Sequence, residues 1–112
     1  MNSDPVAQPP IVTIECQRQG GIAFPMARPR IAMAVTDLPA EEQAALRDLV
    51  QAANVGAQPT RFPGPGHPDA VETELVVRWP EHSATLRFRD GDGHPAQLDE
   101  LAGWVLRHRK AP

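Results

Sequence analysis

The positions of the prolines constrain the fold of this chain more than any other feature of its sequence. Proline lacks a backbone N–H and disrupts the interiors of helices and sheets. The chain has 112 residues, of which 13 are prolines, about twice the ordinary usage. The prolines separate six segments whose interiors contain none. Because each segment can form one helix or one strand, we expect six secondary-structure elements.

Four of these segments alternate apolar and polar residues, which is the pattern of a half-buried strand. They cover residues 11–17, 30–35, 71–79 and 83–89. In the first segment Val12, Ile14 and Cys16 share one face, and we expect Cys16 to be a small core residue. Residues 80–82 form a connection short enough to join the last two strands as a hairpin.

The other two segments, 39–54 and 95–108, space their apolar residues three and four positions apart, as on one face of a helix. The two apolar stripes consist of Leu46, Leu49, Val50 and Ala53, and of Leu98, Leu101, Trp104 and Val105. Asp37 is suited to be the N-cap of the first helix. The run from Asn54 to Gly56 is suited to end it. The sequence therefore predicts two amphipathic helices.

The order strand–strand–helix–strand–strand–helix, with every element apolar on one side, predicts an α+β fold. We expect a four-stranded antiparallel sheet with the two helices packed on one face. We also expect a flexible N-terminal tail at residues 1–10 and a single domain over residues 11–109, since this length suits one core. The other sheet face would turn polar side chains toward water: Thr13, Glu15, Gln17, Glu72, Glu74, Arg78, Arg87 and Arg89.

The composition argues against several classes of partner. Lys and Arg number 11 against 14 Asp and Glu, a net charge of −3, whereas a nucleic-acid-binding domain usually has a basic face. No apolar run approaches the roughly 20 residues of a membrane helix. The polar first ten residues lack the apolar core of a signal peptide. We therefore expect a cytoplasmic protein that binds neither nucleic acid nor membrane, without an internal disulfide because it has one cysteine.

The sequence contains no recognisable catalytic pattern. Its four histidines have neither the i, i+4 spacing nor the nearby Cys or His pairs of a zinc site. Residues 90–93 (Asp-Gly-Asp-Gly) resemble the start of a calcium loop, but the loop's last ligand would fall on Leu101, which is apolar. A tight turn between strand and helix explains the glycines better. We therefore expect no enzyme activity, no cofactor and no metal site.

The connection between the first two strands is longer than a hairpin needs, since two residues would suffice. Residues 18–29 instead include paired glycines, two prolines and the apolar residues Ile22, Phe24 and Met26. Prolines favour extended backbone in the residues before them. Such a loop could enter a peptide-binding cleft, or its apolar side chains could fold back over the end of the sheet. The proline-rich segment 58–70 is a second candidate surface, although a crossover from helix to sheet explains it better.

Three motifs, in this order, resemble the emfourin family. Residues 18–23 (Arg-Gln-Gly-Gly-Ile-Ala) are similar to the family's Arg-x-Gly-Gly-hydrophobe signature. Residues 36–53 resemble its first helix, and residues 98–107 resemble its closing helix. With the intervening strands the resemblance spans residues 11–109, nearly the whole chain. Residues 24–27 (Phe-Pro-Met-Ala) depart from the family pattern, so the preferred target can differ.

The emfourin family comprises proteinaceous inhibitors of thermolysin-like metallopeptidases, typically bacterial and often encoded beside such a peptidase. The resemblance implies that residues 11–109 form an inhibitor-like domain whose partner is a thermolysin-like zinc metallopeptidase. We expect this inhibitor to be a monomer. The alternative is a non-catalytic protein–protein interaction or adaptor domain that uses the polar sheet face or the segment 58–70. The resemblance also implies an inhibitory loop, in which Ile22 or Phe24 fills the apolar pocket after the scissile bond: Gly20, Gly21, Ile22, Ala23, Phe24 and Pro25.

Overall fold

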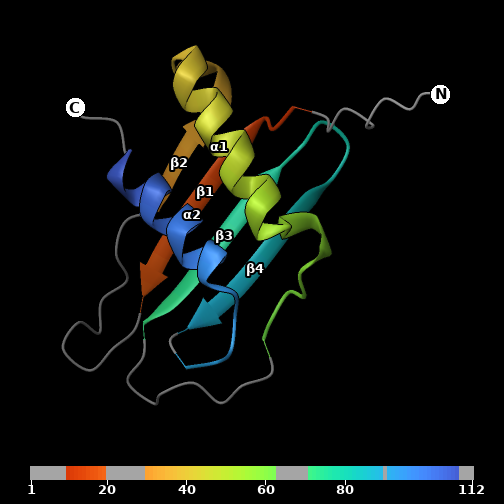
Figure 1. Ribbon diagram of the computed structural model, residues 1–112, viewed down its shortest axis with the longest axis vertical. Coiled ribbons are helices and arrows are strands. Elements are labelled where there is room, and N and C mark those ends of the chain that lie inside the picture. Colours follow the sequence, from red (N-terminus) through yellow and green to blue (C-terminus); the bar gives the residue numbers. More distant parts are fainter. Residues whose placement is uncertain (1–9, 20–29, 63–70, 90, 109–112) are drawn as a thin grey trace.

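The computed structural model describes residues 10–19, 30–62, 71–89 and 91–108, and Figure 1 shows their arrangement. The strands are β1 (Thr13–Gln19), β2 (Ile31–Ala34), β3 (Glu72–Arg78) and β4 (Ser83–Arg89). The helices are α1 (Ala40–Ala53) and α2 (Ala96–Arg107), with the 3₁₀ turns η1 (Val35–Asp37) and η2 (Val55–Ala57) on either side of α1. The predicted order of elements and the α+β class are confirmed, and the predicted bounds differ only at the ends of elements.

The four strands form one antiparallel sheet in the order β2–β1–β3–β4, which the sequence had left open. β1 lies in the interior of the sheet, where Cys16 is opposite Ile31 of β2 and Leu75 of β3. The helices α1 and α2 lie across the same face of the sheet and contact each other (Figure 1). The prediction that both helices pack on one face is confirmed. Among the described residues no helix covers the other face, which we call the open face.

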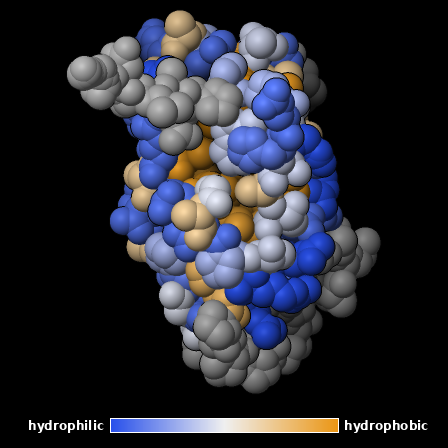
Figure 2. Space-filling view, turned by 90° about the vertical axis from the view of Figure 1, so that its right-hand side faces the viewer, coloured by the Kyte–Doolittle hydropathy of each residue, from blue (hydrophilic) through white to orange (hydrophobic). Residues whose placement is uncertain are grey.

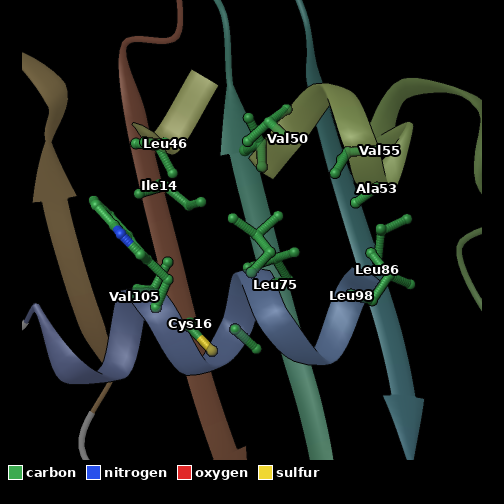
Figure 3. Packing of buried hydrophobic residues seen from close by; sticks show 14 of the residues in the cluster. Ile14, Cys16, Leu46, Val50, Ala53, Val55, Leu75, Leu86, Leu98 and Val105 are labelled. Atoms are coloured by element: carbon green, nitrogen blue, oxygen red, sulfur yellow. The ribbon is translucent and has the colours of Figure 1, made fainter. Parts of the chain in front are cut away.

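The hydrophobic core fills the space between the sheet and the two helices (Figure 3). Burying each large apolar side chain contributes about 1.5–3 kcal/mol, and the predicted inner faces of β3, β4, α1 and α2 supply most of them. The prediction that Val12 shares the buried face of Ile14 and Cys16 is wrong. Val12 is 46% exposed because the regular strand begins only at Thr13, and Ile11 packs against the core instead. The fully buried side chains include Ile14, Cys16, Leu46, Val55, Leu75, Leu86, Leu98, Leu101 and Val105.

Backbone groups define both ends of α1. The predicted N-cap, Asp37, is wrong because this residue belongs to η1, and Pro39 takes the N-cap position instead. The carbonyl of Pro39 accepts hydrogen bonds of 2.9 Å from two N–H groups of the first turn. At the other end Asn54 adopts a left-handed conformation, with φ 52° and ψ 47°. Asparagine tolerates this conformation better than most residues, and the predicted end of the helix at Asn54 is confirmed.

A tight turn connects β4 to α2, as the glycines predicted. Both carboxylate oxygens of Asp92 accept backbone hydrogen bonds, at 2.8 Å from the N–H of Arg89 and at 3.0 Å from the N–H of His94. Gly91 and Gly93 have φ of 86° and 87°, a region that glycine enters without steric cost. The residue that a calcium loop would need as its last ligand is an apolar core residue. The turn interpretation is therefore confirmed for the described residues of this connection.

The imidazole of His94 lies between two carboxylates beside this turn. Its side chain is 6% exposed, with Nδ1 at 2.5 Å from Asp92 Oδ1 and Nε2 at 2.9 Å from Asp99 Oδ1. The rings of Phe62 and Phe88 flank it. Burial alone would lower the pKa of His94, but its hydrogen bonds with the two carboxylates outweigh burial and raise this pKa above 6.5. Burial would raise the pKa of Asp92, yet its hydrogen bond with the His94 ring and those with the backbone N–H groups of Arg89 and His94 hold this pKa below its ordinary value.

We expect this cluster to make stability depend on pH. A histidine with a raised pKa stabilises the folded state fully below its unfolded pKa, near 6.5, and loses that contribution as pH rises through the folded value. His94→Gln should therefore lower the free energy of unfolding by about 2 kcal/mol at pH 6 and by less at pH 9, as measured by urea unfolding. The control His82→Gln removes an exposed imidazole outside the cluster and should keep the wild-type pH dependence. The same loss at both pH values in His94→Gln would contradict this account.

We also expect the thiol of Cys16 to be unreactive in the folded protein. The side chain is fully buried, and burial raises its pKa to about 11, an effect that Arg18 and Arg30 offset only in part. Because the thiolate is the reacting species, iodoacetamide at pH 8 should alkylate the native protein about a hundredfold more slowly than the urea-unfolded protein. Equal rates, measured by mass spectrometry, would show that Cys16 is accessible.

Candidate functional site

The candidate site lies at the end of the sheet where β1 ends and β2 begins. The predicted loop residues Gly20, Gly21, Ile22, Ala23, Phe24 and Pro25 lie outside the described residues. The structure does describe both flanks of this loop, Gln19 at the end of β1 and Arg30 just before β2. Because the two strands are antiparallel, with Cys16 opposite Ile31, both flanks lie at the same end of adjacent strands. The chain therefore leaves β1 and enters β2 at the same end of the sheet.

The second candidate segment, 58–70, returns to the sheet at the same end. Gln19 is opposite Glu72 in the β1–β3 ladder, so the first residue of β3 adjoins the last residue of β1. The described part of the segment runs beside β4, where the carbonyl of Thr60 accepts a 2.8 Å hydrogen bond from the N–H of Arg87. Residues 63–70 lie outside the described residues. The fold thus brings together the flanks of the two segments that the sequence had identified separately.

A row of polar side chains crosses the open face beside this end. Gln17 is opposite Glu74, Glu74 is opposite Arg87, and Arg30 lies beside Gln17, one residue beyond the Cys16–Ile31 pair. Arg30 Nη2 donates to Gln17 Oε1 at 3.2 Å and also to Glu74 Oε1. Arg87 Nε donates to Glu74 Oε2 at 2.9 Å. We call these four residues the cross-sheet row. It contains one residue from each of the three strands β1, β3 and β4 and the residue that precedes β2.

Arg30 joins this row to a second carboxylate. Its Nη1 lies 3.5 Å from Glu15 Oε1, and Arg78 Nη2 lies 3.2 Å from the other oxygen of Glu15. The hydrogen bond from Arg30, together with that from Arg87, holds the pKa of Glu74 below its ordinary range against the opposing effect of burial. Glu74 in turn raises the pKa of Arg30. Both partners of the Arg30–Glu74 pair therefore stay charged at neutral pH.

Sequence reasoning missed two features of the open face. It assigned no role to Arg30, whose neighbours could not be known before the strand order was known. It also did not expect Val76 to be buried on the open face, yet this side chain is only 7% exposed. The pairing of Glu74 with Arg87 could have been inferred, because a short hairpin at residues 80–82 fixes the β3–β4 register.

The arrangement of the described residues does not suggest catalysis. No group of three or more His, Cys, Asp or Glu side chains among them could hold a metal ion. The carboxylate of Glu74 is paired with Arg30 and Arg87, and such pairing keeps a carboxylate ionised rather than poised to transfer a proton. None of the helices described is both long and apolar enough to cross a membrane. At this end of the sheet, strand pairing instead fixes the positions of the flanks of the two candidate segments.

A separate groove lies toward the opposite end of the sheet, between α1 and the β3–β4 hairpin. Trp79, Val50 and Gln51 line both parts of this groove. Figure 2 views this side of the molecule and shows hydrophobic surface near its middle, bordered by hydrophilic side chains. The remaining lining residues are Pro10, Ile11, Val35, Gln43, Leu46, Arg47, Asn54, Val55, Gly56 and His82. The groove lies at the far end of β1 from the loop flanks, so we treat it as a separate feature.

Comparison with known proteins identifies the family. The chain is similar to one solved structure, described as emfourin (M4in) from Serratia proteamaculans, an M4 family peptidase inhibitor, with 22% identity over 99% of this chain and 100% of that chain and a TM-score of 0.39. No curated protein matches the chain. The sequence model of the emfourin family matches residues 16–106. Members of this family are peptidase inhibitors and not enzymes, which confirms the expectation that the chain is no enzyme. Since the match covers most of the chain, the protein belongs to the emfourin family.

Proposed function

We propose that this emfourin inhibits a thermolysin-like zinc metallopeptidase by placing the loop between β1 and β2 in the active-site cleft. Membership of a family of peptidase inhibitors is the observation that carries the proposal. The inhibitory residues would be Gly20, Gly21, Ile22, Ala23, Phe24 and Pro25. We further propose that the protein acts as a monomer in the bacterial cytoplasm.

The geometry of the loop flanks supports this mechanism. The two flanks are fixed by adjacent antiparallel strands. The inner face of β1 is buried in the core through Ile14 and Cys16. On the open face, the cross-sheet row holds Arg30 at the point where the loop rejoins the sheet. A segment whose ends are fixed in advance loses less conformational entropy when it binds, and this raises affinity.

The chemistry of the loop favours occupation of the cleft over chelation of the catalytic zinc. Residues 20–25 contain no cysteine or histidine, which are the side chains with the highest affinity for zinc. They do contain Ile22 and Phe24. Thermolysin-like enzymes prefer a bulky apolar side chain just after the scissile bond, and we propose that one of these two residues fills that pocket. The fixed flanks would then keep the bound loop from reaching a geometry that permits cleavage.

The test is titration of the pure protein against thermolysin with a peptide substrate, comparing Ile22→Asp and Phe24→Asp with the wild type. Loss of a buried apolar anchor costs about 2 kcal/mol or more. The variant that removes the anchor should therefore raise the inhibition constant by about thirtyfold or more. Val12→Asp is the matched control, because it places the same charge on an exposed apolar residue at the far end of β1.

Three outcomes separate the alternatives. Loss of inhibition in a loop variant, with Val12→Asp unaffected, would support the loop as the inhibitory element. Full inhibition by both loop variants would remove the loop from the mechanism. If the wild type has no effect on any thermolysin-like peptidase but binds another protein in a pull-down, the alternative of an adaptor domain would replace the inhibitor hypothesis.

A further inference from the structure

We propose that Arg30 is a positioning residue for the inhibitory loop. By pairing with the carboxylate of Glu74 in the middle of the sheet, it restrains the point where the loop rejoins the sheet. This inference rests on the proposed function, because it concerns how the loop is held for binding. It adds a role for residues that neither the sequence motifs nor the family match single out.

The position of Arg30 is the first observation. It is the first described residue after the loop and the last before β2, so its backbone marks the end of the β1–β2 ladder. Its side chain crosses β1 and reaches Glu74 on β3, which is two strands away in the sheet order. A displacement of the loop's return point would therefore have to break contacts with two other strands.

The second observation is that the anchor of Arg30 is itself fixed. Glu74 is in the interior strand β3, and its side chain is 16% exposed. One carboxylate oxygen accepts from Arg30, and the other accepts from Arg87 on β4 at 2.9 Å. Because its two oxygens accept from arginines on different strands, the carboxylate is restrained in one orientation. Arg30 is thus bound to a rigid acceptor.

The third observation is the use of the guanidinium fork. Nη2 of Arg30 faces Glu74 and Gln17, whereas Nη1 faces Glu15. A planar fork that is engaged in two directions restrains the rotation of the side chain as well as its reach. A lysine would bring the same charge but only one donor centre. The role therefore depends on the shape of arginine in addition to its charge.

A positioning role predicts that substitution changes inhibition more than stability. The side chain of Arg30 is 36% exposed, and ion pairs this exposed to solvent contribute little to folding stability. Restraint of a binding segment, in contrast, acts directly on affinity. The competing explanation for any loss of inhibition is that Arg30 contacts the peptidase itself, since it is exposed and next to the loop. Glu74 distinguishes the two explanations, because it is mostly covered and belongs to the sheet.

The experiment is a double-mutant cycle on the inhibition constant for thermolysin, with Arg30→Met, Glu74→Met and the double variant. Positioning predicts that each single substitution raises the inhibition constant about tenfold. The double variant should be no worse than either single one, because all three variants remove the same interaction, that between Arg30 and Glu74. Arg30→Lys should lose most of this affinity. The matched control is Arg78→Met, which removes another arginine that pairs with Glu15 on the same face but at the far end of β3, and it should inhibit like the wild type.

Hydrogen exchange of the free inhibitor gives a second readout. Positioning predicts faster exchange in the peptides that contain Cys16 to Gln19 and Arg30 to Ala34 for Arg30→Met and Glu74→Met, but not for Arg78→Met. Thermal melts of the same variants establish that each is folded, and we expect their melting temperatures to stay within a few degrees of the wild type.

The outcomes also separate this inference from the proposed function. A wild type that fails to inhibit thermolysin-like peptidases would overturn the proposed function. If the wild type inhibits and Glu74→Met inhibits equally well, the inference alone is overturned, and a loss in Arg30→Met would then indicate direct contact with the peptidase. Losses of affinity that add up in the double variant would likewise contradict the inference that both residues act through one shared interaction.

Discussion

The pairing of β1 with both β2 and β3 is the constraint on which the rest of this structure depends. Since β1 is in the interior of the sheet, its register decides which side chains enter the core and where both ends of the β1–β2 connection lie. A slip of one residue would turn Ile14 and Cys16 to the open face and bring Glu15 under the helices. The apolar face of β1 therefore fixes the fold and, at the same time, the geometry of the loop it carries.

The two faces of the sheet are stabilised by different means. The inner face is buried under α1 and α2, so its residues contribute through removal of apolar surface from water. The open face has no helix over it in the part of the chain that the structure describes, and arginine–glutamate pairs extend across it. Val76, which is buried on this face, is opposite Glu15 in the β1–β3 ladder. Such ion pairs contribute little to stability but define orientation. This division allows the protein to keep its stability in the core while the cross-sheet row holds the loop flanks.

Much of the fold could be predicted from the sequence because the apolar periods are regular. Patterns such as the stripe from Leu46 to Ala53 and the alternation through Leu75 and Val77 specified whether each element is a helix or a strand. They also specified which face of each element is buried and the order of the elements along the chain. Local patterns do not specify which strands are neighbours, so the contact between Arg30 and Glu74, 44 positions apart, could not be predicted. Val12 and Asp37 were misassigned at element ends, where the periodic signal stops and backbone hydrogen bonds decide. The loop at 20–25 was identified by its unusual composition and by resemblance, and its role remains a proposal.

The most direct measurement of how this emfourin acts is a crystal structure of its complex with a thermolysin-like peptidase. We predict that residues 20–25 occupy the active-site cleft, with Ile22 or Phe24 in the apolar pocket beyond the scissile bond position and the guanidinium of Arg30 still paired with Glu74. A complex in which the cleft is empty and the peptidase contacts the open face or the groove around Trp79 would contradict inhibition by the loop.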